Sequence, residues 1–596
     1  MPGAEGSGID TPGAYRARAA ELGLRFLASP LGEGYRSRPD AANDVTAIAA
    51  AIRKGSLAAA ERGDERVIFI APDRGDVLSL SARIRKDPSI AGLVIVTTPT
   101  AIRRLLLARY RMTLVRDATD RLATRRPDLS ARRLVTATEG AILAVLLFAI
   151  AAAVFFLGAP AIATIEILAG FVFLATVLLR MQAISVVTHR RRHRRTELPR
   201  VAPDTLPVYS ILLPLYREPH MVAELAGCME RLVWPREKLD IKLIIEADDS
   251  ATLAAAKALR LQPPFEILTV PAYGPRTKPK ALAFALPLAR GEYVTVFDAE
   301  DRPDPLQLIE AHLAFRRGGA DLACVQAPLL VDNTASNGLT ALFALEYSVQ
   351  FDGVLPLLAD LDLPLPLGGT SNHFRRSVLE EVGGWDPYNV TEDADLGLRL
   401  ARFGYRSGVI DRPTLEEAPR TVGVWLGQRT RWLKGWMQTL LVHLRSPRRL
   451  LREIGPRRFA YCLLVLFGSL VAAAIHPVYL ATALALLFDP ARLWRADSPL
   501  FAAMTMLSLF NLVSAYGVFV LLSRETFHLR RLPWPASALV YLPAYWLLMS
   551  LACYRAIGEL IIAPHHWSKT RHVGRRVRPA AQPAEETSEK VAQPVG

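Results

Sequence analysis

The sequence predicts an α/β domain with a mostly parallel sheet, inserted between α-helical transmembrane segments and preceded by a small α/β module. Three observations support this prediction. Uncharged apolar runs long enough to span a bilayer lie on both sides of the central region. In the central region short apolar strands alternate with helical patterns, which is typical of a parallel sheet covered by helices. The strands end in acidic clusters, and ligands bind at the carboxyl ends of strands in such sheets.

The composition fits a soluble part joined to membrane helices. Apolar residues make up 51% of the chain and charged residues 22%. The net charge of +15 fits basic loops that face anionic lipid. Binding of nucleic acid is the rival explanation, but the arginine clusters flank apolar runs and do not cover one polar face. We therefore expect membrane lipid as a partner and no nucleic acid. The cysteines have no spacing typical of zinc ligands and are expected to be packed thiols.

Residues 1–135 are predicted to form a small cytoplasmic α/β module. Strands are expected at 66–72 and 92–98, and helices at 17–27, 44–53, 77–86 and 100–109. This order resembles the N-terminal domain of type II secretion ATPases, some of which bind cyclic di-GMP. The module carries no catalytic constellation. A docking or structural role is therefore favoured, with binding of cyclic di-GMP or of a regulatory protein as the alternative.

The apolar runs predict a transmembrane hairpin at residues 138–183 and further membrane helices within 459–563. The basic cluster at 189–195 places the adjoining domains in the cytoplasm by the positive-inside rule. The three later apolar runs would leave the basic C-terminal tail outside if each crossed once. We therefore expect the first of them to split at Pro477, which gives four crossings. A re-entrant or interfacial final helix is the competing solution.

Two acidic clusters follow predicted strands of the central domain, residues 205–458. Asp248 and Asp249 follow the strand at 241–245, and Asp298, Glu300 and Asp301 follow the strand at 293–297. Carboxylate oxygens are the ligands that Mg²⁺ and similar hard cations prefer. A metal site is therefore predicted after the later strand, with Asp298 as one ligand and Glu300 or Asp301 as another.

A third acidic segment, Thr391-Glu392-Asp393, precedes a helical stretch that contains Gln428, Arg431 and Trp432. Asp393 can accept a proton from an incoming hydroxyl group and is the predicted general base. The i, i+3, i+4 spacing places Gln428, Arg431 and Trp432 on one face of a helix. Arg431 can bind a diphosphate through its fork of donors, and Trp432 can lie flat against a sugar ring. Asp395 is expected to point to another face.

These motifs together resemble the processive members of glycosyltransferase family 2, which include the cellulose and hyaluronan synthases. The resemblance covers residues 205–440 and implies a GT-A-like nucleotide-sugar transferase fold. It further implies a UDP-sugar donor, a growing glycan acceptor and Mg²⁺ or Mn²⁺ as the cofactor. Glu300 departs from the family's Asp-x-Asp pattern, so Glu300 and Asp301 are both candidates for the second metal ligand.

The resemblance also assigns roles to individual residues. Those expected to bind the nucleotide sugar are Pro214, Tyr216, Glu218, Asp248, Asp249, Lys280, Asp298, Gln428 and Arg431, with Lys278 as the alternative to Lys280. Those expected to bind the acceptor are Gly369, Thr370, Ser371, Glu392 and Trp432. Residues 564–596 are expected to hold a gating segment with Trp567, Lys569 and Thr570, followed by a disordered tail.

The sequence therefore predicts an inverting β-glycosyltransferase of a bacterial-type inner membrane, with its catalytic domain in the cytoplasm. It would transfer a hexosyl unit from a UDP-sugar to a growing polysaccharide and export that polymer. The first alternative is a single-transfer enzyme that makes a glycolipid or a lipid-linked precursor. The second is a catalytically inactive membrane receptor or scaffold.

Overall fold

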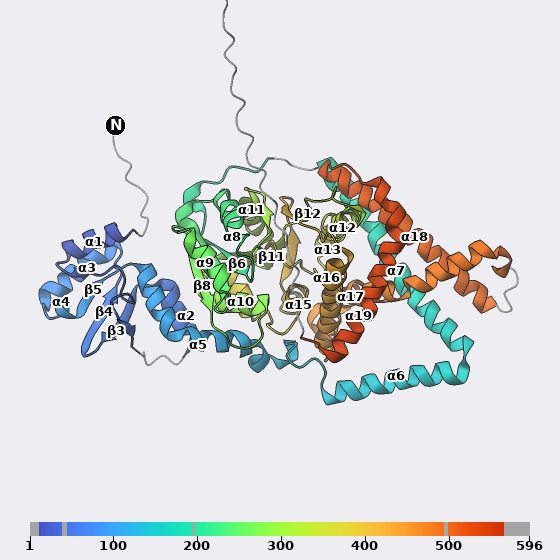
Figure 1. Ribbon diagram of the computed structural model, residues 1–596, viewed down its shortest axis with the longest axis horizontal. Helices are drawn as coiled ribbons and strands as arrows, with labels where there is room; N and C mark the ends of the chain where they lie inside the picture. The colour runs from blue at the N-terminus through green and yellow to red at the C-terminus, as the bar shows by residue number, and fades with distance from the viewer. Residues whose placement is uncertain (1–10, 39–43, 194–196, 494–498, 566–596) are drawn as a thin grey trace, which may run out of the picture.

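The computed structural model describes residues 11–38, 44–193, 197–493 and 499–565, in three parts (Figure 1). An N-terminal module lies at one end, an α/β domain occupies the middle, and long apolar helices extend from the other end. Helix α5 connects the first two parts, and helices α16 and α19 stand side by side where the α/β domain meets the long helices.

The N-terminal module has a five-stranded sheet in the order β1-β5-β4-β3-β2. Its strands are β1 (Arg25–Phe26), β2 (Arg36–Ser37), β3 (Leu57–Arg62), β4 (Glu65–Ile70) and β5 (Val94–Val96), and its helices are α1 (Pro12–Glu21), α2 (Val45–Lys54), α3 (Arg74–Lys86), α4 (Ile90–Leu93) and α5 (Pro99–Arg125). The predicted strands correspond to β4 and β5, whereas β3 was not expected. The predicted first helix is wrong at both ends: α1 already begins at Pro12, and it stops at Glu21, because Gly23 adopts a positive φ of 65°.

The central domain is built on a seven-stranded sheet in the order β14-β11-β13-β9-β6-β7-β8. Its strands are β6 (Tyr209–Leu215), β7 (Leu239–Glu246), β8 (Phe265–Val270), β9 (Tyr293–Val296), β11 (Leu322–Gln326), β13 (Asn372–Arg375) and β14 (Arg406–Val409). The helices that cover it are α8 (Val222–Glu230), α9 (Ser250–Ala258), α10 (Lys278–Ala285), α11 (Gln307–Gly318), α14 (Arg376–Glu381) and α15 (Glu392–Arg402). Large hydrophobic cores lie on both faces of the sheet.

The sheet is mixed but mostly parallel, as predicted: four of its six strand pairings are parallel, and β13 runs opposite to the other six strands. Strands β9, β6, β7 and β8 are parallel neighbours. Strand β13 is antiparallel to both β9 and β11, because the chain returns through residues 361–371 from the side on which the parallel strands end. That return brings the loop before β13 to the carboxyl ends of the parallel strands.

A second layer separates the sheet from the long helices. It contains a small sheet of β10 (Arg302–Pro303), β15 (Thr414–Glu416) and β12 (Leu329–Val331). Helix α12 (Gly338–Ser348) continues through a π-helical segment, η5 (Val349–Val354), into α13 (Leu355–Asp360). Helix α16 (Val422–His443) confirms the predicted helical stretch that carries Gln428, Arg431 and Trp432.

The long helices are α6 (Ala137–Leu157), α7 (Ala159–His193), α17 (Pro447–Phe488), α18 (Pro499–Arg530) and α19 (Leu542–Ile562), the last preceded by the short helix η7 (Ala536–Tyr541). Six described segments are long and apolar enough to cross a membrane: these helices and residues 338–360. Within the segment 338–360, an apolar window of 18 residues is 89% buried inside the protein, so its apolar character reflects packing against the other helices.

The predicted split at Pro477 is wrong. Helix α17 continues through Pro477, and its one residue with non-helical backbone angles is Gly455. Proline is tolerated inside membrane helices because neighbouring groups satisfy the freed carbonyl oxygen.

Helix α19 instead runs along α16. Trp425 Nε1 donates to the Tyr545 hydroxyl at 3.3 Å near one end of α19, and Gln438 Nε2 donates to the Pro564 carbonyl at 2.8 Å beyond the other end. Both ends of α19 therefore contact α16 of the central domain.

Candidate active site

A cavity of about 370 Å³ opens between the carboxyl ends of the parallel strands, helix α16 and the long helices. Asp298, Asp393 and Arg431 all line this cavity, although they are far apart in the sequence. The cavity continues past α16, where Phe173 of α7 and Phe519 of α18 form part of its wall. The same space therefore joins the acidic loops of the α/β domain to the bundle of apolar helices.

The end of the cavity beside β6 and β7 contains part of the predicted nucleotide site. Pro214, Tyr216 and Glu218 line it. Asp248 and Asp249 are not among the lining residues, in contrast to the prediction. Asp249 instead caps α9 and accepts a hydrogen bond from the backbone N–H of Arg217, and Asp248 forms an ion pair with Arg276 at 2.9 Å. These carboxylates hold the loop and a cavity-lining arginine in place.

Of the two candidate phosphate lysines, Lys278 lines the cavity and Lys280 does not. Lys280 is fully buried and pairs with Glu246 at 2.8 Å, so the prediction of Lys280 as a donor ligand is corrected. Lys278 Nζ donates to Asp298 Oδ1, and to the Gly369 carbonyl oxygen at 2.6 Å. Lys278 and Lys280 lie in the first turn of α10, which directs only the former into the cavity.

The carboxylates of the acidic segment after β9 point in two directions. Asp298 and Glu300 line the cavity, whereas Asp301 turns back into the protein and is 1% exposed. Asp301 accepts hydrogen bonds from the Asp298 backbone N–H at 2.6 Å and from the Thr370 hydroxyl. Both bonds reach Oδ2 and hold two loops together, whereas Oδ1 is buried without a hydrogen-bond partner among the described residues. Glu300 lines the cavity and is the better-placed second metal ligand, and Asp301 stays a candidate.

The protein supplies only some of the oxygen ligands that a hard divalent cation needs. Two carboxylates, Asp298 and Glu300, face the cavity, and no group of three or more His, Cys, Asp or Glu side chains is arranged as a metal site within the described residues. A cation such as Mg²⁺ commonly takes one or two carboxylates and completes its shell with substrate phosphates and water. The residues present are compatible with that mode of binding.

The loop before β13 reaches the acidic segment at the start of α15. Gly369 and Thr370 line the cavity, and Ser371 is buried with its hydroxyl bonded to Thr414 at 2.6 Å. A Cβ atom on Gly369 would lie 3.2 Å from Asp393 Oδ2. The glycine thus allows the loop backbone to approach the predicted base closely. Ser371 does not line the cavity, which corrects its prediction as an acceptor ligand.

Glu392 and Asp393 begin α15 and face Lys278 and Arg431. Burial raises the pKa of the Asp393 carboxyl, and the positive charges of Lys278 and Arg431 oppose this shift. Burial, followed by the charge of Asp393, raises the pKa of Glu392. A carboxyl group whose pKa is raised toward neutrality is a stronger base than an ordinary aspartate while it can still ionise.

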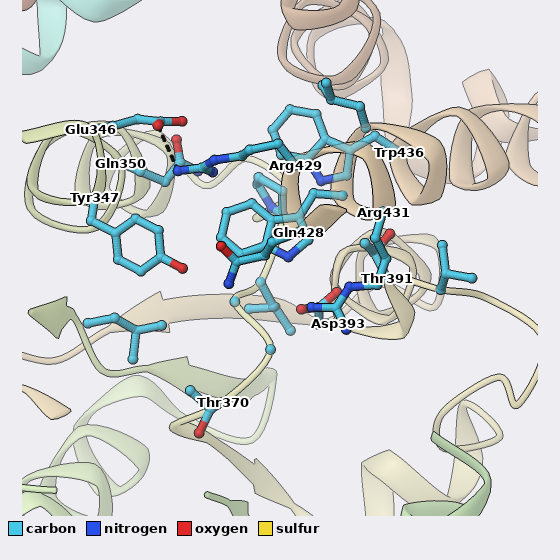
Figure 2. Close-up of a pocket in the computed structure, with 18 of the residues that line it drawn as sticks. Glu346, Tyr347, Gln350, Thr370, Thr391, Asp393, Gln428, Arg429, Arg431 and Trp436 are labelled. Carbon is cyan, nitrogen blue, oxygen red and sulfur yellow. Dashed lines mark hydrogen bonds and ion pairs between the residues drawn. The ribbon is translucent and has the colours of Figure 1, made fainter. Parts of the chain in front are cut away.

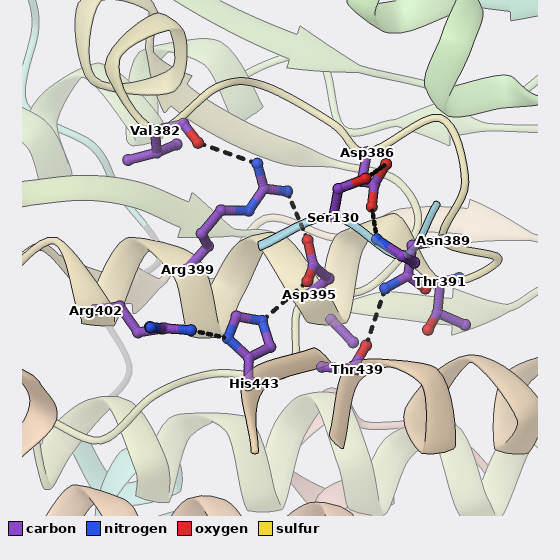
Figure 3. Close-up of polar contacts among 12 residues, drawn as sticks. Ser130, Val382, Asp386, Asn389, Thr391, Asp395, Arg399, Arg402, Thr439 and His443 are labelled. Atoms are coloured by element: carbon purple, nitrogen blue, oxygen red, sulfur yellow. Dashed lines mark hydrogen bonds and ion pairs between the residues drawn. The ribbon is translucent and has the colours of Figure 1, made fainter. Parts of the chain in front are cut away.

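Asp395 does not face the cavity, as predicted from the helical period. It is buried between Arg399 at 2.6 Å and His443 at 2.9 Å, and Arg402 donates to the other nitrogen of His443 (Figure 3). His443 belongs to α16, so this buried group of charges fixes α15 against α16. This contact thereby fixes the position of Asp393, on α15, relative to Arg431, on α16.

The loop that leads to Asp393 is fixed from two sides. Asn389 donates to Thr439 of α16 at 3.2 Å, and Asp386 accepts from the Ala131 backbone N–H at 2.5 Å and from the Ser130 hydroxyl at 3.2 Å (Figure 3). The residues at 130 and 131 follow α5 of the N-terminal module. The module therefore contacts the segment that positions the predicted base.

Helix α16 presents Gln428, Arg431 and Trp432 to the cavity, as their spacing predicts. Arg431 has Glu392, Asp298 and Asp393 as its nearest negative charges. The Trp432 ring lies 5.8 Å from the Tyr347 ring, and the guanidinium of Arg429 lies 4.4 Å from the centre of the Trp432 ring. Trp436 also lines the cavity.

Several cavity residues were not found from the sequence. Glu346 and Tyr347 come from α12, and Glu346 forms an ion pair with Arg429 at 2.7 Å (Figure 2). Glu416 lies at the end of β15, and burial followed by the charge of Glu300 raises its pKa to about 8. In the sequence, only the isolated charge of Glu346 within an otherwise apolar helical segment could have indicated one of these cavity residues.

The predicted gating residues Trp567, Lys569 and Thr570 lie outside the described part of the chain. The last described residue, His565, is placed beside the Tyr388 carbonyl oxygen at 3.1 Å. The four cysteines are buried and unpaired, in agreement with their prediction as packed thiols.

Comparisons with known proteins find matches in this central region. The family model described as "Glycosyl transferase family group 2" matches residues 293–489. A beta-monoglucosyldiacylglycerol synthase of Trichormus variabilis is 26% identical over 275 residues, which cover 46% of this chain and 57% of that protein. A probable glucomannan 4-beta-mannosyltransferase of Arabidopsis thaliana is 25% identical over 243 residues, or 39% of this chain and 44% of that protein.

The matched regions thus span about half the length of these relatives. Among solved structures, the mannosyltransferase PcManGT from Pyrobaculum calidifontis, in complex with GDP-Man and Mn²⁺, gives a TM-score of 0.36 at 20% identity. That comparison covers 58% of this chain and 99% of the other.

Proposed function

We propose that the protein is a membrane-bound inverting hexosyltransferase of the glycosyltransferase family 2 type, which the match of residues 293–489 to that family model supports. It transfers a sugar from a nucleotide sugar, such as a UDP-sugar, to an acceptor hydroxyl group that enters from the bundle of apolar helices. One observation carries this proposal: a single cavity contains Asp393, Lys278 and Arg431 and continues between the long helices.

The donor occupies the end of the cavity near β6 and β7. Tyr216 and Glu218 contact the nucleoside, and Lys278 and Arg431 neutralise the diphosphate. Mg²⁺ or Mn²⁺, held by Asp298 and Glu300, would supply further stabilisation of charge on the leaving diphosphate. The chemistry of such a site is positioning plus electrostatic stabilisation, so the cationic side chains account for much of the rate enhancement.

Asp393 acts as the general base. As the acceptor oxygen forms a bond to the anomeric carbon, its proton passes to the Asp393 carboxylate, and the bond from the anomeric carbon to the diphosphate oxygen breaks. The electron pair leaves with the nucleoside diphosphate. A single displacement inverts the anomeric centre, so an α-linked donor gives a β-linked product.

The acceptor end favours a glycan. Six aromatic side chains line the cavity: Tyr347, Trp432, Trp436, Tyr516, Phe519 and Trp546. Flat aromatic faces can stack on sugar rings, and several of them suit a chain of sugars better than a single unit. We therefore infer a growing polysaccharide that leaves through the bundle, as processive synthesis at an inner membrane requires. In this arrangement the N-terminal module and the central domain both lie in the cytoplasm.

A glycolipid is the second candidate acceptor. Leu512, Met549 and Ala473 give the bundle end of the cavity apolar walls, which fit an acyl or prenyl chain. The relative that is named a beta-monoglucosyldiacylglycerol synthase supports the same idea. The matches to glycosyltransferases and the charged groups in the cavity support an enzyme over an inactive receptor or scaffold.

The N-terminal module acts as a docking element in this proposal. Arg53 of α2 pairs with Glu380 at 2.8 Å, and Tyr273 donates to Asp120 of α5 at 3.1 Å. The loop of Tyr273 also carries Arg276, which lines the cavity. Binding of cyclic di-GMP or of a regulatory protein to the module would act through these contacts.

The experiment that tests the proposal uses full-length protein reconstituted in vesicles and a panel of labelled UDP- and GDP-sugars. We expect one donor to give a labelled β-linked product and release of nucleoside diphosphate. Product length separates the two acceptors, because a polymer grows with time whereas a glycolipid gains one sugar. Retention of full activity by Asp393→Asn would contradict the proposal, and Asp204→Asn, an exposed aspartate, provides the matched control.

A further inference from the structure

One arginine of the cavity lies deep among the apolar helices. Arg180 belongs to α7, and Arg190 of the same helix forms an ion pair with Asp411 of the central domain. At about 1.5 Å of rise per residue, Arg180 lies roughly 15 Å further into the bundle than Arg190. Its side chain lines the cavity.

Arg180 has no hydrogen-bond or ion-pair partner among the described residues. Within the described part of the chain, the one charged side chain close enough to interact with Arg180 is Glu346. Glu346 already pairs with Arg429 at 2.7 Å and accepts a hydrogen bond from the Tyr545 hydroxyl. Two arginines therefore share one carboxylate, which leaves one positive charge uncompensated at this end of the cavity.

An uncompensated charge in such surroundings is costly. Charged side chains within membrane helices are rare, face the interior of the bundle, and mark sites that bind or conduct a ligand. Phe173 and Val177, on the same stretch of α7, are buried apolar residues, so packing around Arg180 does not require a charge. The position of Arg180 therefore indicates an anionic ligand.

This ligand is not the donor diphosphate. Arg431 has Asp298, Glu392 and Asp393 around it, whereas Arg180 is influenced by Glu346 alone. Figure 2 shows Glu346 and Gln350 on the opposite side of the cavity from Asp393 and Arg431. Gln350 belongs to the π-helical segment η5, which packs against α7. π-Helical turns inside α-helices are frequent at functional sites.

We propose that Arg180 and Gln350 form an acceptor subsite for an oxyanion, a phosphate or a carboxylate, carried by the acceptor at a distance from the hydroxyl group that is glycosylated. An arginine can bind either group through two parallel N–H donors, and the glutamine amide can add a third. This inference rests on the proposed transferase function and narrows it. A lipid acceptor would carry a phosphate headgroup, and a glycan acceptor would contain uronic acid units.

The test measures binding without donor, so that it does not depend on catalysis. Full-length protein in neutral phosphatidylcholine vesicles is titrated with two pairs of probes, and tryptophan fluorescence of the cavity reports binding. The first pair is short-chain phosphatidic acid and the matching diacylglycerol. The second pair is a galacturonate trisaccharide and cellotriose. The variants are Arg180→Gln, Arg180→Lys and, as a matched loss of charge on the exposed end of the same helix, Arg192→Gln.

We expect the wild-type protein to bind one anionic probe more tightly than its neutral partner. Arg180→Gln should weaken binding of that probe by about ten- to a hundredfold, the range for a charge-assisted hydrogen bond, and leave the neutral probe unchanged. Arg180→Lys should retain part of the preference, and Arg192→Gln all of it. The preferred anionic probe identifies the source of the oxyanion as lipid or glycan.

Two results would overturn the inference: equal binding of anionic and neutral probes by the wild-type protein, or equal losses for both members of a pair in Arg180→Gln. Release of nucleoside diphosphate from the donor is measured on the same preparations. Donor-dependent transfer without any charge preference refutes the subsite alone. A charge preference without transfer under any donor refutes the proposed function and leaves the subsite standing.

Discussion

Gly435 of α16 provides a direct test of how the structure positions the predicted base. A Cβ atom at Gly435 would lie 2.2 Å from Thr391 Oγ1 and 2.7 Å from Thr391 Cβ. Rotation of the Thr391 side chain can remove the first clash but not the second, because Cβ moves only with the backbone. A normal contact between two carbon atoms is about 3.5–4.0 Å, so Gly435→Ala should displace the Thr391 backbone by roughly 1 Å.

This displacement would reach the chemistry directly. Thr391 is the residue before Glu392 and Asp393, and Arg431 lies one turn before Gly435 on α16. A misplacement of about 1 Å can reduce an enzymatic rate by roughly a hundredfold. We therefore expect Gly435→Ala to lower kcat by about two orders of magnitude, with little change in KM for the donor.

The matched control is Gly427→Ala in the same helix. A Cβ atom at Gly427 would meet no other atom within 4 Å. Alanine stabilises a helix by about 1 kcal/mol relative to glycine, so this variant should keep its activity and gain slightly in thermal stability. Steady-state release of nucleoside diphosphate and thermal melts measure both effects. If Gly435→Ala remains folded and keeps its kcat within twofold of the wild type, the packing of α15 on α16 does not position the base.

The remaining predictions concern the charged groups. Asp393→Asn should reduce kcat by about 10²- to 10⁴-fold, which is the usual contribution of a general base. Thermal stability should not fall, because the substitution removes a buried charge beside Glu392. A coincident fall in melting temperature would indicate misfolding instead. Because burial raises the pKa of Asp393, wild-type activity should rise with pH through a range above the ordinary aspartate pKa, and a pH–rate profile with its acidic limb at or below the ordinary value would contradict this. Lys278→Met should abolish most activity in a folded protein. Lys280→Met should mainly lower the melting temperature, because it leaves Glu246 buried without its partner. The reverse pattern would restore Lys280 as the residue that binds the donor. Removal of divalent cations with EDTA should stop transfer, and Mg²⁺ or Mn²⁺ should restore it in the wild type but less in Asp298→Asn; undiminished activity in EDTA would exclude the metal role. Burial raises the pKa of Asp386 to about 6, so the native state binds this proton more tightly than the unfolded state does. The stability of the contact between Asp386 and residues 130–131 should therefore fall as the pH rises through about 4 to 6. Asp386→Asn should flatten that pH dependence in thermal melts.

The periodic pattern of apolar residues was sufficient to predict the main strands and helices of the central domain. Parallel strands β6, β7, β8 and β9 are short, largely apolar segments separated by turn residues and helical patterns, so a local pattern is enough to predict them. The helix that carries Gln428, Arg431 and Trp432 also follows from spacing, because a period of 3.6 residues fixes which side chains share a face. Asp298 and Asp393 were found because carboxylates that follow strands and open helices are visible without knowledge of the fold.

Other features depended on contacts between distant segments. Lys278 and Lys280 are two residues apart in the same turn, and only the position of Glu246 decides which of them is buried. Asp301 follows the same strand as Asp298 and Glu300, but it bonds to Thr370 of a distant loop and does not line the cavity. The direction of β13 and the path of α19 likewise depend on partners far away in the sequence.

The sequence by itself determined the class of the domain, the presence of membrane-type helices and the residue types that could bind a nucleotide sugar. These properties depend on composition and on short-range periodicity, which the chain carries locally. The tertiary structure alone decided which of those residues face one cavity, that α19 runs along α16, and that Arg180 stands beside a carboxylate already in use. Such properties arise from burial and charge pairing among segments hundreds of residues apart, and no local pattern encodes them.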